Sequence, residues 1–351
     1  MQSLNDLFVT IASFLRGTMA LWGFPQLLTD SIMGLVSFIA IATLVTLNII
    51  LILWVDRRVA SFFQERLGPN RVGPFGLLQS INDAAKLIGK ESILPAAADK
   101  RVYKAAPLIV FTITMVLYGF LPYGKGMLPL NFNVGLLFFV AIASTTTIAI
   151  LMAGWGSNNK YSLLGGMRTV AQVISDEIPL AFSMLGVVMI SGSMNLGQIS
   201  AAQHGVWFVF IQPLAFLIFL ISALAELTRS PFDMTEAEQE LIAGYHTEYS
   251  GMRFALFFMA EYANLFCVAA LGATLFLGGW SGPILPGWLW FIGKTWAMVL
   301  VILWLRWTFP RARVDKMMKF NWKFLIPLSI LNILLTGVGI KLYQYFTAVG
   351  R

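Results

Sequence analysis

The sequence predicts an all-α, polytopic integral membrane protein, and three observations support this fold class. Hydrophobic residues make up 58% of the 351 residues, whereas charged residues make up only 12%. A soluble domain is roughly one quarter charged and about half apolar, so this apolar surface requires lipid as its solvent. Apolar runs recur at the length of roughly 20 residues that crosses a bilayer. The charged residues gather in alternate loops between these runs.

Eight apolar runs are predicted to cross the membrane within a single membrane domain of residues 1–351. The predicted spans are residues 32–55, 105–123, 134–155, 170–190, 206–225, 254–277, 288–305 and 324–346. In the segment 1–31, the apolar run precedes the first basic residue, Arg16, which is the reverse of the order in a signal peptide. That run is too short to span, so we expect residues 1–31 to lie in the membrane interface.

The loops between the spans differ sharply in positive charge. The first, third, fifth and seventh loops carry nine, two, two and six Lys or Arg residues, which is 19 of the 24 in the chain. The positive-inside rule therefore places these four loops in the cytoplasm and both termini on the non-cytoplasmic side. This asymmetry accounts for the net charge of +7, so no nucleic-acid partner is predicted.

Cysteine and histidine are too scarce for the chain to hold a redox centre of its own. Cys267 is the single cysteine, which excludes a disulfide framework and an iron–sulfur or zinc cluster made by this chain. The two histidines, His204 and His246, fall on opposite sides of the predicted membrane, which excludes a bis-histidine haem. We therefore expect no cofactor bound by this chain, and a redox role would need a diffusible substrate or a cofactor of a partner.

The first cytoplasmic loop, residues 56–104, contains an amphipathic segment. Turn residues at 68–70 precede apolar positions with helical spacing from Leu77 to Ile88, and polar residues occupy the other face. Such a helix can lie along the membrane surface as an anchor. It can also form a portal where an apolar molecule leaves the lipid and meets charged groups. The charged groups of such a portal would suit a quinone, whose carbonyls need hydrogen-bond donors.

Acidic residues inside the predicted spans point to proton chemistry. Asp176 and Glu177 lie in the fourth span, and an ionised carboxylate there costs about 3 kcal/mol. A structural salt bridge is one interpretation of them, and a proton-carrying site is the favoured one. Glu261 and Lys294 are single ionisable residues within other spans. With Glu177 and Glu226 they predict a chain of titratable groups that leads into the membrane, as in proton relays.

The fifth loop, residues 226–253, holds six acidic residues against two basic ones, on the side where positive charge is expected. Crowded and sheltered carboxylates can titrate near neutrality, but a solvated acidic loop would look the same. His246 is predicted to be a hydrogen-bonded loop histidine rather than a ligand. The seventh loop carries bases that set topology or face the acidic loop. The acidic residues of the fifth loop are Glu226, Asp233, Glu236, Glu238, Glu240 and Glu248.

Four motifs in order resemble the H subunit of respiratory complex I, the proton-translocating NADH:quinone oxidoreductase. They read ERLGPNRVGPFGLLQSINDAAKLIGKE, SNNKYSLLGGMR, SPFDMTEAEQELIAGYHTEYSGMRFALFF and FPRARVDKMMKFNWKFLIPL. The resemblance runs from about residue 32 to the C-terminus. It implies eight spans, a membrane chamber for quinone, iron–sulfur and flavin subunits that supply electrons from the cytoplasmic side, and small and antiporter-like membrane subunits as partners.

The resemblance also implies roles for individual residues. It places five residues at the quinone chamber or its entry: Arg57, Arg66, Asp83, Arg306 and Arg311. It places eight others on the acidic path that couples quinone reduction to pumping: Glu177, Glu226, Asp233, Glu236, Glu238, Glu240, Glu248 and Glu261. The chain departs from the family pattern at three positions, where Asp56, Asp176 and Thr235 stand in place of glutamate, tyrosine and proline.

Together these observations predict a subunit of a proton-translocating NADH:quinone oxidoreductase in a bacterial plasma membrane. Related alternatives are the same type of subunit in a ferredoxin:quinone oxidoreductase or in a membrane-bound hydrogenase. A self-contained proton-coupled transporter is an alternative of another class, although no internal repeat supports it. A structural anchor for a soluble enzyme would leave Glu177, Glu261 and Lys294 unexplained.

Overall fold

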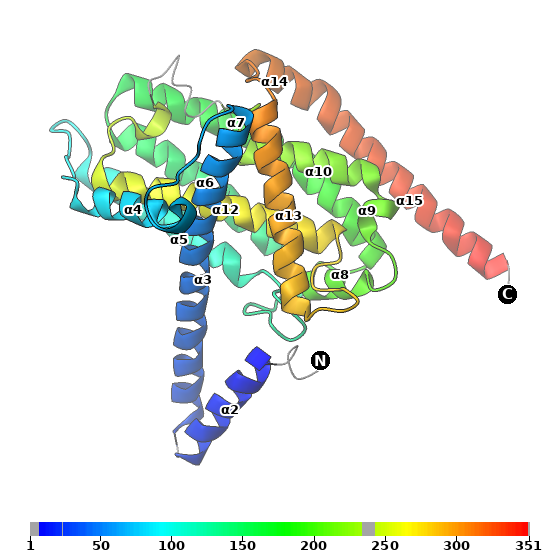
Figure 1. Ribbon diagram of the computed structural model, residues 1–351. Helices are drawn as coiled ribbons and strands as arrows, with labels where there is room; N and C mark the ends of the chain where they lie inside the picture. Colours follow the sequence, from blue (N-terminus) through cyan, green and yellow to red (C-terminus); the bar gives the residue numbers. More distant parts are fainter. Residues whose placement is uncertain (1–6, 23, 234–242, 350–351) are drawn as a thin grey trace.

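A computed structural model describes residues 7–22, 24–233 and 243–349 of the chain. Within these ranges the protein is built from helices, and the backbone forms no β-strand. The predicted all-α membrane fold is therefore confirmed. Figure 1 shows a bundle of inclined helices from which the two ends of the chain extend as long helices.

In the described residues, seven helices are long and apolar enough to cross a membrane. Each corresponds to one of the predicted spans. They are α3 (Gln26–Phe63), α5 (Lys100–Gly119), α6 (Gly135–Gly156), α7 (Lys160–Ser191), α12 (Gly251–Phe276), α13 (Gly287–Thr308) and the segment Val314–Thr347. That last segment comprises α14 (Val314–Phe320), the π-helical turn η3 (Asn321–Leu325) and most of α15 (Ile326–Val349).

The remaining predicted span, residues 206–225, forms two shorter helices, α9 (Phe208–Ile211) and α10 (Pro213–Glu226). Pro213 has no backbone N–H, and it disfavours helical geometry at the preceding residue. Gln212 accordingly leaves the helical region, with φ −129° and ψ 61°. The 14 residues of α10 rise about 21 Å, which is less than the hydrocarbon thickness of about 30 Å.

Several helices extend beyond the predicted apolar runs, because a helix does not end where the lipid ends. The helix α3 continues past Asp56 to Phe63. The helix α7 begins ten residues before the predicted fourth span, and the side chain of Asn159 caps it by accepting a hydrogen bond from the Tyr161 N–H at 2.9 Å. It ends at Gly192, which adopts the left-handed conformation typical of a helix C-terminus.

The helix α12 forms the centre of the bundle. Every residue from Leu265 to Phe276 is buried, so this half of the helix is surrounded by protein on all sides. It packs against α5 and α13, and the rings of Tyr118 and Phe266 stack with centroids 5.7 Å apart. A helix that is apolar all round is the element expected at the core of a large helical protein.

The outer ends of the chain are rich in exposed apolar surface. The helix α2 (Leu7–Leu21) and the first half of α3 extend away from the bundle, and α15 projects from the opposite side (Figure 1). Large apolar side chains such as Phe14, Phe38 and Leu334 are more than half exposed. Such surfaces are stable in lipid or against other membrane subunits, and not in water.

The amphipathic segment of the first loop forms α4 (Gln79–Gly89), preceded by the short turn η1 (Pro74–Gly76). It packs against α3 and α12 and leaves Ile81 and Ile88 exposed. Gly251, with φ +60°, lets the first and fifth loops approach, since a Cβ atom there would lie 2.8 Å from the Lys90 carbonyl oxygen. The predicted amphipathic helix is thus present, and its apolar face is free to meet a membrane.

Candidate functional site

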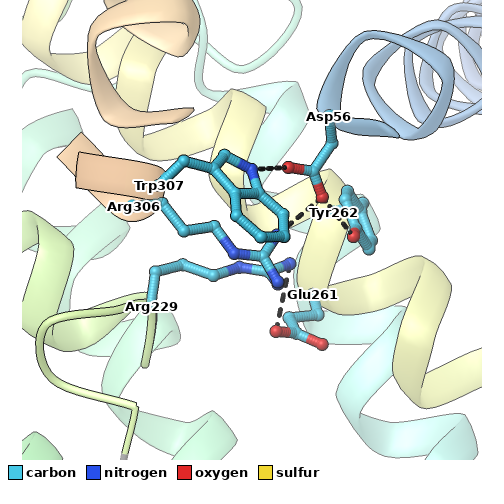
Figure 2. Close-up of polar contacts among 6 residues, drawn as sticks. All are labelled: Asp56, Arg229, Glu261, Tyr262, Arg306 and Trp307. Carbon is cyan, nitrogen blue, oxygen red and sulfur yellow. Dashed lines mark hydrogen bonds and ion pairs between the residues drawn. The ribbon is translucent and has the colours of Figure 1, made fainter. Parts of the chain in front are cut away.

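A buried carboxylate on α3 is the starting point of the site. Asp56 is 5% exposed, and three donors from two other helices converge on it (Figure 2). Its Oδ2 accepts hydrogen bonds from Arg306 Nη1 at 2.6 Å and from the Tyr262 hydroxyl at 2.8 Å. Its Oδ1 accepts from Trp307 Nε1 at 2.9 Å. The carboxylate is thereby held rigidly between α3, α12 and α13.

A second ion pair lies beside the first. Arg229 follows the end of α10 and is 3% exposed; its Nη2 lies 3.0 Å from Glu261 Oε1. The Arg229 guanidinium also lies over the ring of Tyr262, 4.6 Å from its centroid. Tyr262 therefore joins the two pairs, since its hydroxyl contacts one and its ring contacts the other (Figure 2). We call these six residues the ionic centre: Asp56, Arg229, Glu261, Tyr262, Arg306 and Trp307.

The ionic centre balances two acidic groups with two basic groups. Burying a charge is expensive unless it is paired and hydrogen-bonded. Loss of one partner of a buried pair typically costs about 3–5 kcal/mol, because the other charge is left without compensation. The charges come from α3, from the loop after α10, from α12 and from α13. Any change of charge at this point therefore acts on four segments together.

Two of the five residues predicted to bind quinone contact each other at the start of the first loop. Arg57 Nη1 lies 2.5 Å from Asp83 Oδ2, which ties α3 to α4, and both side chains are about one third exposed or more. Gln79 Nε2 donates to the other oxygen of Asp83 at 3.1 Å. Because Arg57 is adjacent to Asp56, this half-exposed pair continues outward from the ionic centre.

The structure places the other three predicted quinone residues differently. Arg306 belongs to the ionic centre. Arg66 is exposed in the turn after α3, and Arg311 is partly buried in the link between α13 and α14. In that link the Ala312 N–H donates to the Pro231 carbonyl at 2.8 Å, so the seventh loop lies against the fifth.

Two of the predicted acidic residues line one pocket inside the bundle. Glu177, in the middle of α7, and Glu226, the last residue of α10, both face this pocket between α6, α7, α10 and α12. Apart from these two acids, Ser144 is the polar residue that lines the pocket, and the other lining side chains are apolar. Two carboxyl groups in such a setting strongly resist being ionised together. Such a pair of acidic groups is suited to holding a proton.

The fifth loop is only partly described. Asp233 is partly buried at its start, whereas Glu236, Glu238 and Glu240 lie outside the described residues. Glu248, after this gap, accepts a hydrogen bond from Asn159 Nδ2 at 2.6 Å. This contact binds the end of the loop to the start of α7.

Aromatic rings hold the same end of the loop. The rings of Tyr103 and Tyr249 stack with centroids 4.1 Å apart, and the Tyr249 hydroxyl donates to the Tyr103 carbonyl at 3.2 Å. Burial raises the pKa of Tyr249, so it remains a donor. His246 is buried beside Tyr245 and Phe254, its ring edge-on to both. The predicted loop histidine is thus a packed one.

Lys294 lies apart from the acidic residues. Its Nζ donates at 2.6 Å to each of two carbonyl oxygens, those of Leu277 and Ser281, and lies 4.6 Å from the ring centroid of Trp207. Leu277 caps the C-terminus of α12, whereas Glu261 is nearer the N-terminus of that helix. The helix rise between Glu261 and Leu277 is about 24 Å. The structure therefore does not bring Lys294 together with Glu177, Glu226 or Glu261.

Comparison with known proteins decides which family this arrangement belongs to. The sequence model of the family described as NADH dehydrogenase matches residues 36–337, which include every residue of the ionic centre and of the pocket shared by Glu177 and Glu226. The chain belongs to the NADH dehydrogenase family.

Close relatives extend this result over nearly the whole chain. The H subunit of NADH-quinone oxidoreductase from Carboxydothermus hydrogenoformans is 48% identical over 97% of this chain and 98% of its own length. The H subunits from Dehalococcoides mccartyi and Geobacillus kaustophilus are 49% and 53% identical, over 87% and 81% of this chain and 86% of each relative. The predicted resemblance is confirmed, and the chain is a membrane subunit of an oxidoreductase complex of this type.

Sequence reasoning missed much of the ionic centre in this member of the NADH dehydrogenase family. The sequence marks Asp56 only as a departure from the family pattern and Arg229 only as one of two loop bases, and it gives no sign of Tyr262 or Trp307. One signal is present, because Asp56 and Arg306 are opposite charges at the ends of two apolar runs on the same predicted side. Pairing them still requires knowing that α3 and α13 are neighbours.

Residues of the types that bind metals are scattered over the ranges that the structure describes. There, no three residues of the types His, Cys, Asp and Glu are grouped so as to hold a metal ion. Cys267 is buried in the centre of α12. Where the redox centres of the complex reside stays a prediction from the resemblance.

Proposed function

We propose that this subunit forms much of the membrane part of a quinone chamber and couples quinone reduction to proton translocation. The observation that carries the proposal is the pocket shared by Glu177 and Glu226. Two carboxyl groups that face one largely apolar space form a site that can hold a proton and pass it on. Intramembrane acids with this arrangement are typical of proton relays.

The ionic centre supports the coupling part of this proposal. Reduction of a quinone takes up two electrons and two protons, so a residue that donates one of these protons becomes more negative by one charge. In a low-dielectric setting, charges interact over longer distances than in water. Asp56 and Arg306 form a largely buried pair next to Arg57, the first of the proposed quinone residues. A charge change at the quinone is thereby felt by the pair Arg229–Glu261 and by the acids behind it.

For the quinone itself we propose entry along α4. Its exposed Ile81 and Ile88 would face lipid, and the pair Arg57–Asp83 lies where α4 meets α3. Amphipathic surface helices with such faces lie in the membrane interface. The residues proposed at the chamber or its entry remain Arg57, Arg66, Asp83, Arg306 and Arg311.

For the proton path we propose the acids of the fifth loop and of the bundle. They are Asp233, Glu236, Glu238, Glu240 and Glu248 in the loop, and Glu177, Glu226 and Glu261 in the bundle. Lys294 is also predicted to extend this path. Because it bonds to the Leu277 and Ser281 carbonyls, far from these acids, its part in the path stays a prediction.

The proposed partners follow from the same assignment. Iron–sulfur and flavin subunits would bind on the cytoplasmic side and supply electrons, and small and antiporter-like subunits would bind in the membrane. The exposed apolar surfaces of α3 and α15 are suited to lipid and to such membrane partners. The proposed location is the plasma membrane of a bacterium, with both termini outside the cytoplasm.

The direct test replaces Glu226 with glutamine in the assembled complex. We expect NADH:quinone reductase activity and proton pumping to fall on the order of tenfold while assembly is retained, because glutamine keeps the shape and cannot exchange a proton. Glu177→Gln should act in the same direction. Asp30→Asn is the matched control, since Asp30 is an exposed acid near the start of α3. Full coupled activity in both glutamine variants would remove the pocket from the mechanism.

Purification of the tagged chain in mild detergent separates the alternatives. Iron–sulfur and antiporter-like partners with NADH oxidation support the proposal. The same partners without NADH oxidation indicate a ferredoxin-dependent complex, and hydrogen turnover indicates a hydrogenase. A chain recovered alone that moves protons after reconstitution would contradict the proposal and support a transporter.

A further inference from the structure

Asp176 is a buried acid that the proposed path does not include. It lies on α7 and is 0% exposed. Its Oδ1 accepts a hydrogen bond from Asn321 Nδ2. Its Oδ2 is buried and has no hydrogen-bond partner among the described residues. An ionised carboxylate with one bare oxygen in the interior is costly, whereas the neutral acid is much less so.

The charged surroundings of Asp176 favour proton binding over a salt bridge. Glu177 is the next residue of α7, and Glu226 is the last residue of α10, which packs against α7. Carboxylates close to one another disfavour being ionised together. The helices α6 and α8 (Leu196–Ala202) carry no charged residue. Of the other groups on elements packed against α7, Glu261 is paired with Arg229, Arg253 lies over the ring of Tyr103, and His246 is packed between rings. The remaining charges on α14, η3 and α15 are partly or fully exposed, and they are Asp315, Lys316, Lys319, Lys323 and Lys341.

The partner of Asp176 is suited to both protonation states. The Asn321 side chain has a donating NH₂ group and an accepting oxygen. Its Nδ2 contacts Asp176, while its Oδ1 is buried and has no partner among the described residues. An amide rotation would let the same residue donate to the carboxylate or accept from the carboxylic acid. Asn321 is also the first residue of the π-helical turn η3, and such turns often occur at functional sites.

We propose that Asp176 is a third proton-holding carboxyl group of the Glu177–Glu226 site, with Asn321 as its positioning residue. This inference rests on the proposed function, because it adds a member to the proton path. One proton can be held by any of the three carboxyl groups and passed between them, so that the site keeps the same number of protons during the exchange. Asn321 connects this site to α14 and α15, whose preceding link lies against the fifth loop.

The test measures proton pumping as a function of pH in the assembled complex of three variants. Asp176→Asn removes one negative charge, so the remaining carboxylates hold a proton less tightly. We expect the alkaline limb of its pH profile to move down by about one pH unit. Asn321→Leu removes the donor to Asp176, so the limb should move upward. Asp315→Asn, at an exposed acid in the first turn of α14, is the control and should leave the profile in place.

Infrared difference spectra give a second reading on the same samples. A protonated carboxyl group absorbs in a separate carbonyl region, and Asp176→Asn should remove one such band. Opposite pH shifts and loss of the band support the proposal. An unshifted profile in both variants, or an unchanged carbonyl region, overturns it. If Asp176→Asn does not assemble, Asn321→Leu and the wild-type spectrum still decide.

The Glu226→Gln variant separates this inference from the proposed function. If Glu226→Gln loses pumping and Asp176→Asn shows no shift, only the third carboxyl group is wrong. If Glu226→Gln pumps normally, the proposed proton path through Glu226 is wrong. The proposal for Asp176 then fails with it.

Discussion

The ionic centre and the surroundings of Lys294 both bury basic groups, and they stabilise them in two different ways. At the ionic centre, Asp56 and Glu261 are each matched by an arginine. At the outer end of α12, Lys294 is matched by no acid among the described residues; two backbone carbonyls and the ring of Trp207 surround it. We call this second region the outer lysine site.

This contrast indicates which of the two buried regions can respond to a change of charge nearby. The partners of Lys294 are fixed dipoles, and the C-terminus of α12 adds the negative end of its helix dipole. Carbonyl oxygens do not titrate, so the partners of Lys294 keep the same charge. The ionic centre consists of side chains whose charges and positions can change together. The first region is suited to signalling a charge change, and the second to holding helices in place.

The largest expected effect comes from breaking the ionic centre at Arg306. Arg306→Met leaves Asp56 buried without its cation, which should cost about 3–5 kcal/mol of stability. The amount of assembled complex and its thermal inactivation midpoint report this loss. The double variant Asp56→Leu with Arg306→Met removes both charges and should recover much of the stability but not the coupled activity. If the double variant recovered both stability and coupled activity, the pair Asp56–Arg306 would have a structural role only. The ionic centre would then not differ from the outer lysine site in its ability to signal a charge change.

A smaller effect is expected at the outer lysine site. Lys294→Met leaves the Leu277 and Ser281 carbonyls without their donor, which should cost about 1.5–3 kcal/mol of stability. Lys294→Arg keeps the charge and serves as the matched variant. Thermal inactivation is measured together with protons pumped per electron. A lower pumping ratio in Lys294→Met, without loss of stability, would contradict the contrast and return Lys294 to the proton path.

The smallest effect on stability is expected at the half-exposed pair Arg57–Asp83. Solvent screens this pair, so Asp83→Asn should cost less than about 1 kcal/mol. Because Asp83 is proposed at the quinone entry, the KM for quinone should rise several-fold while the kcat changes little. Glu91→Gln, at an exposed acid shortly after α4, is the control. An unchanged KM would separate Asp83 from quinone binding.

Local patterns predicted the individual elements well. Seven of the eight predicted spans correspond to helices of spanning length in the described residues, and the spacing from Leu77 to Ile88 predicted α4. The break in the remaining predicted span was also present in the sequence, as Pro213 in the middle of an apolar run. Hydropathy averaged over a window of residues does not detect this break, because one proline changes the average very little. Helix lengths were underestimated for a similar reason, since polar ends such as those of α3 and α7 lie outside the apolar runs.

Spatial pairing was not accessible in the same way. Asp56 and Arg306 are 250 residues apart in the chain, a separation that no local motif spans. Asp176 and Asn321 are 145 residues apart. The sequence around either residue does not indicate that the two side chains are in contact. The sequence shows that Lys294 is in a span but not what surrounds it, and its part in the acidic path stays a prediction.

The sequence alone was enough to predict the solvent of this protein, its topology and its family. These properties depend on composition, on loop charge and on contiguous motifs, all of which are local. The tertiary structure was needed to define which charges share a site. Helices of similar hydropathy can pack in many orders, and the order is set by side-chain packing such as that around α12. The ionic centre, the acidic pocket and the outer lysine site therefore exist only once α3, α7, α10, α12 and α13 have found their neighbours.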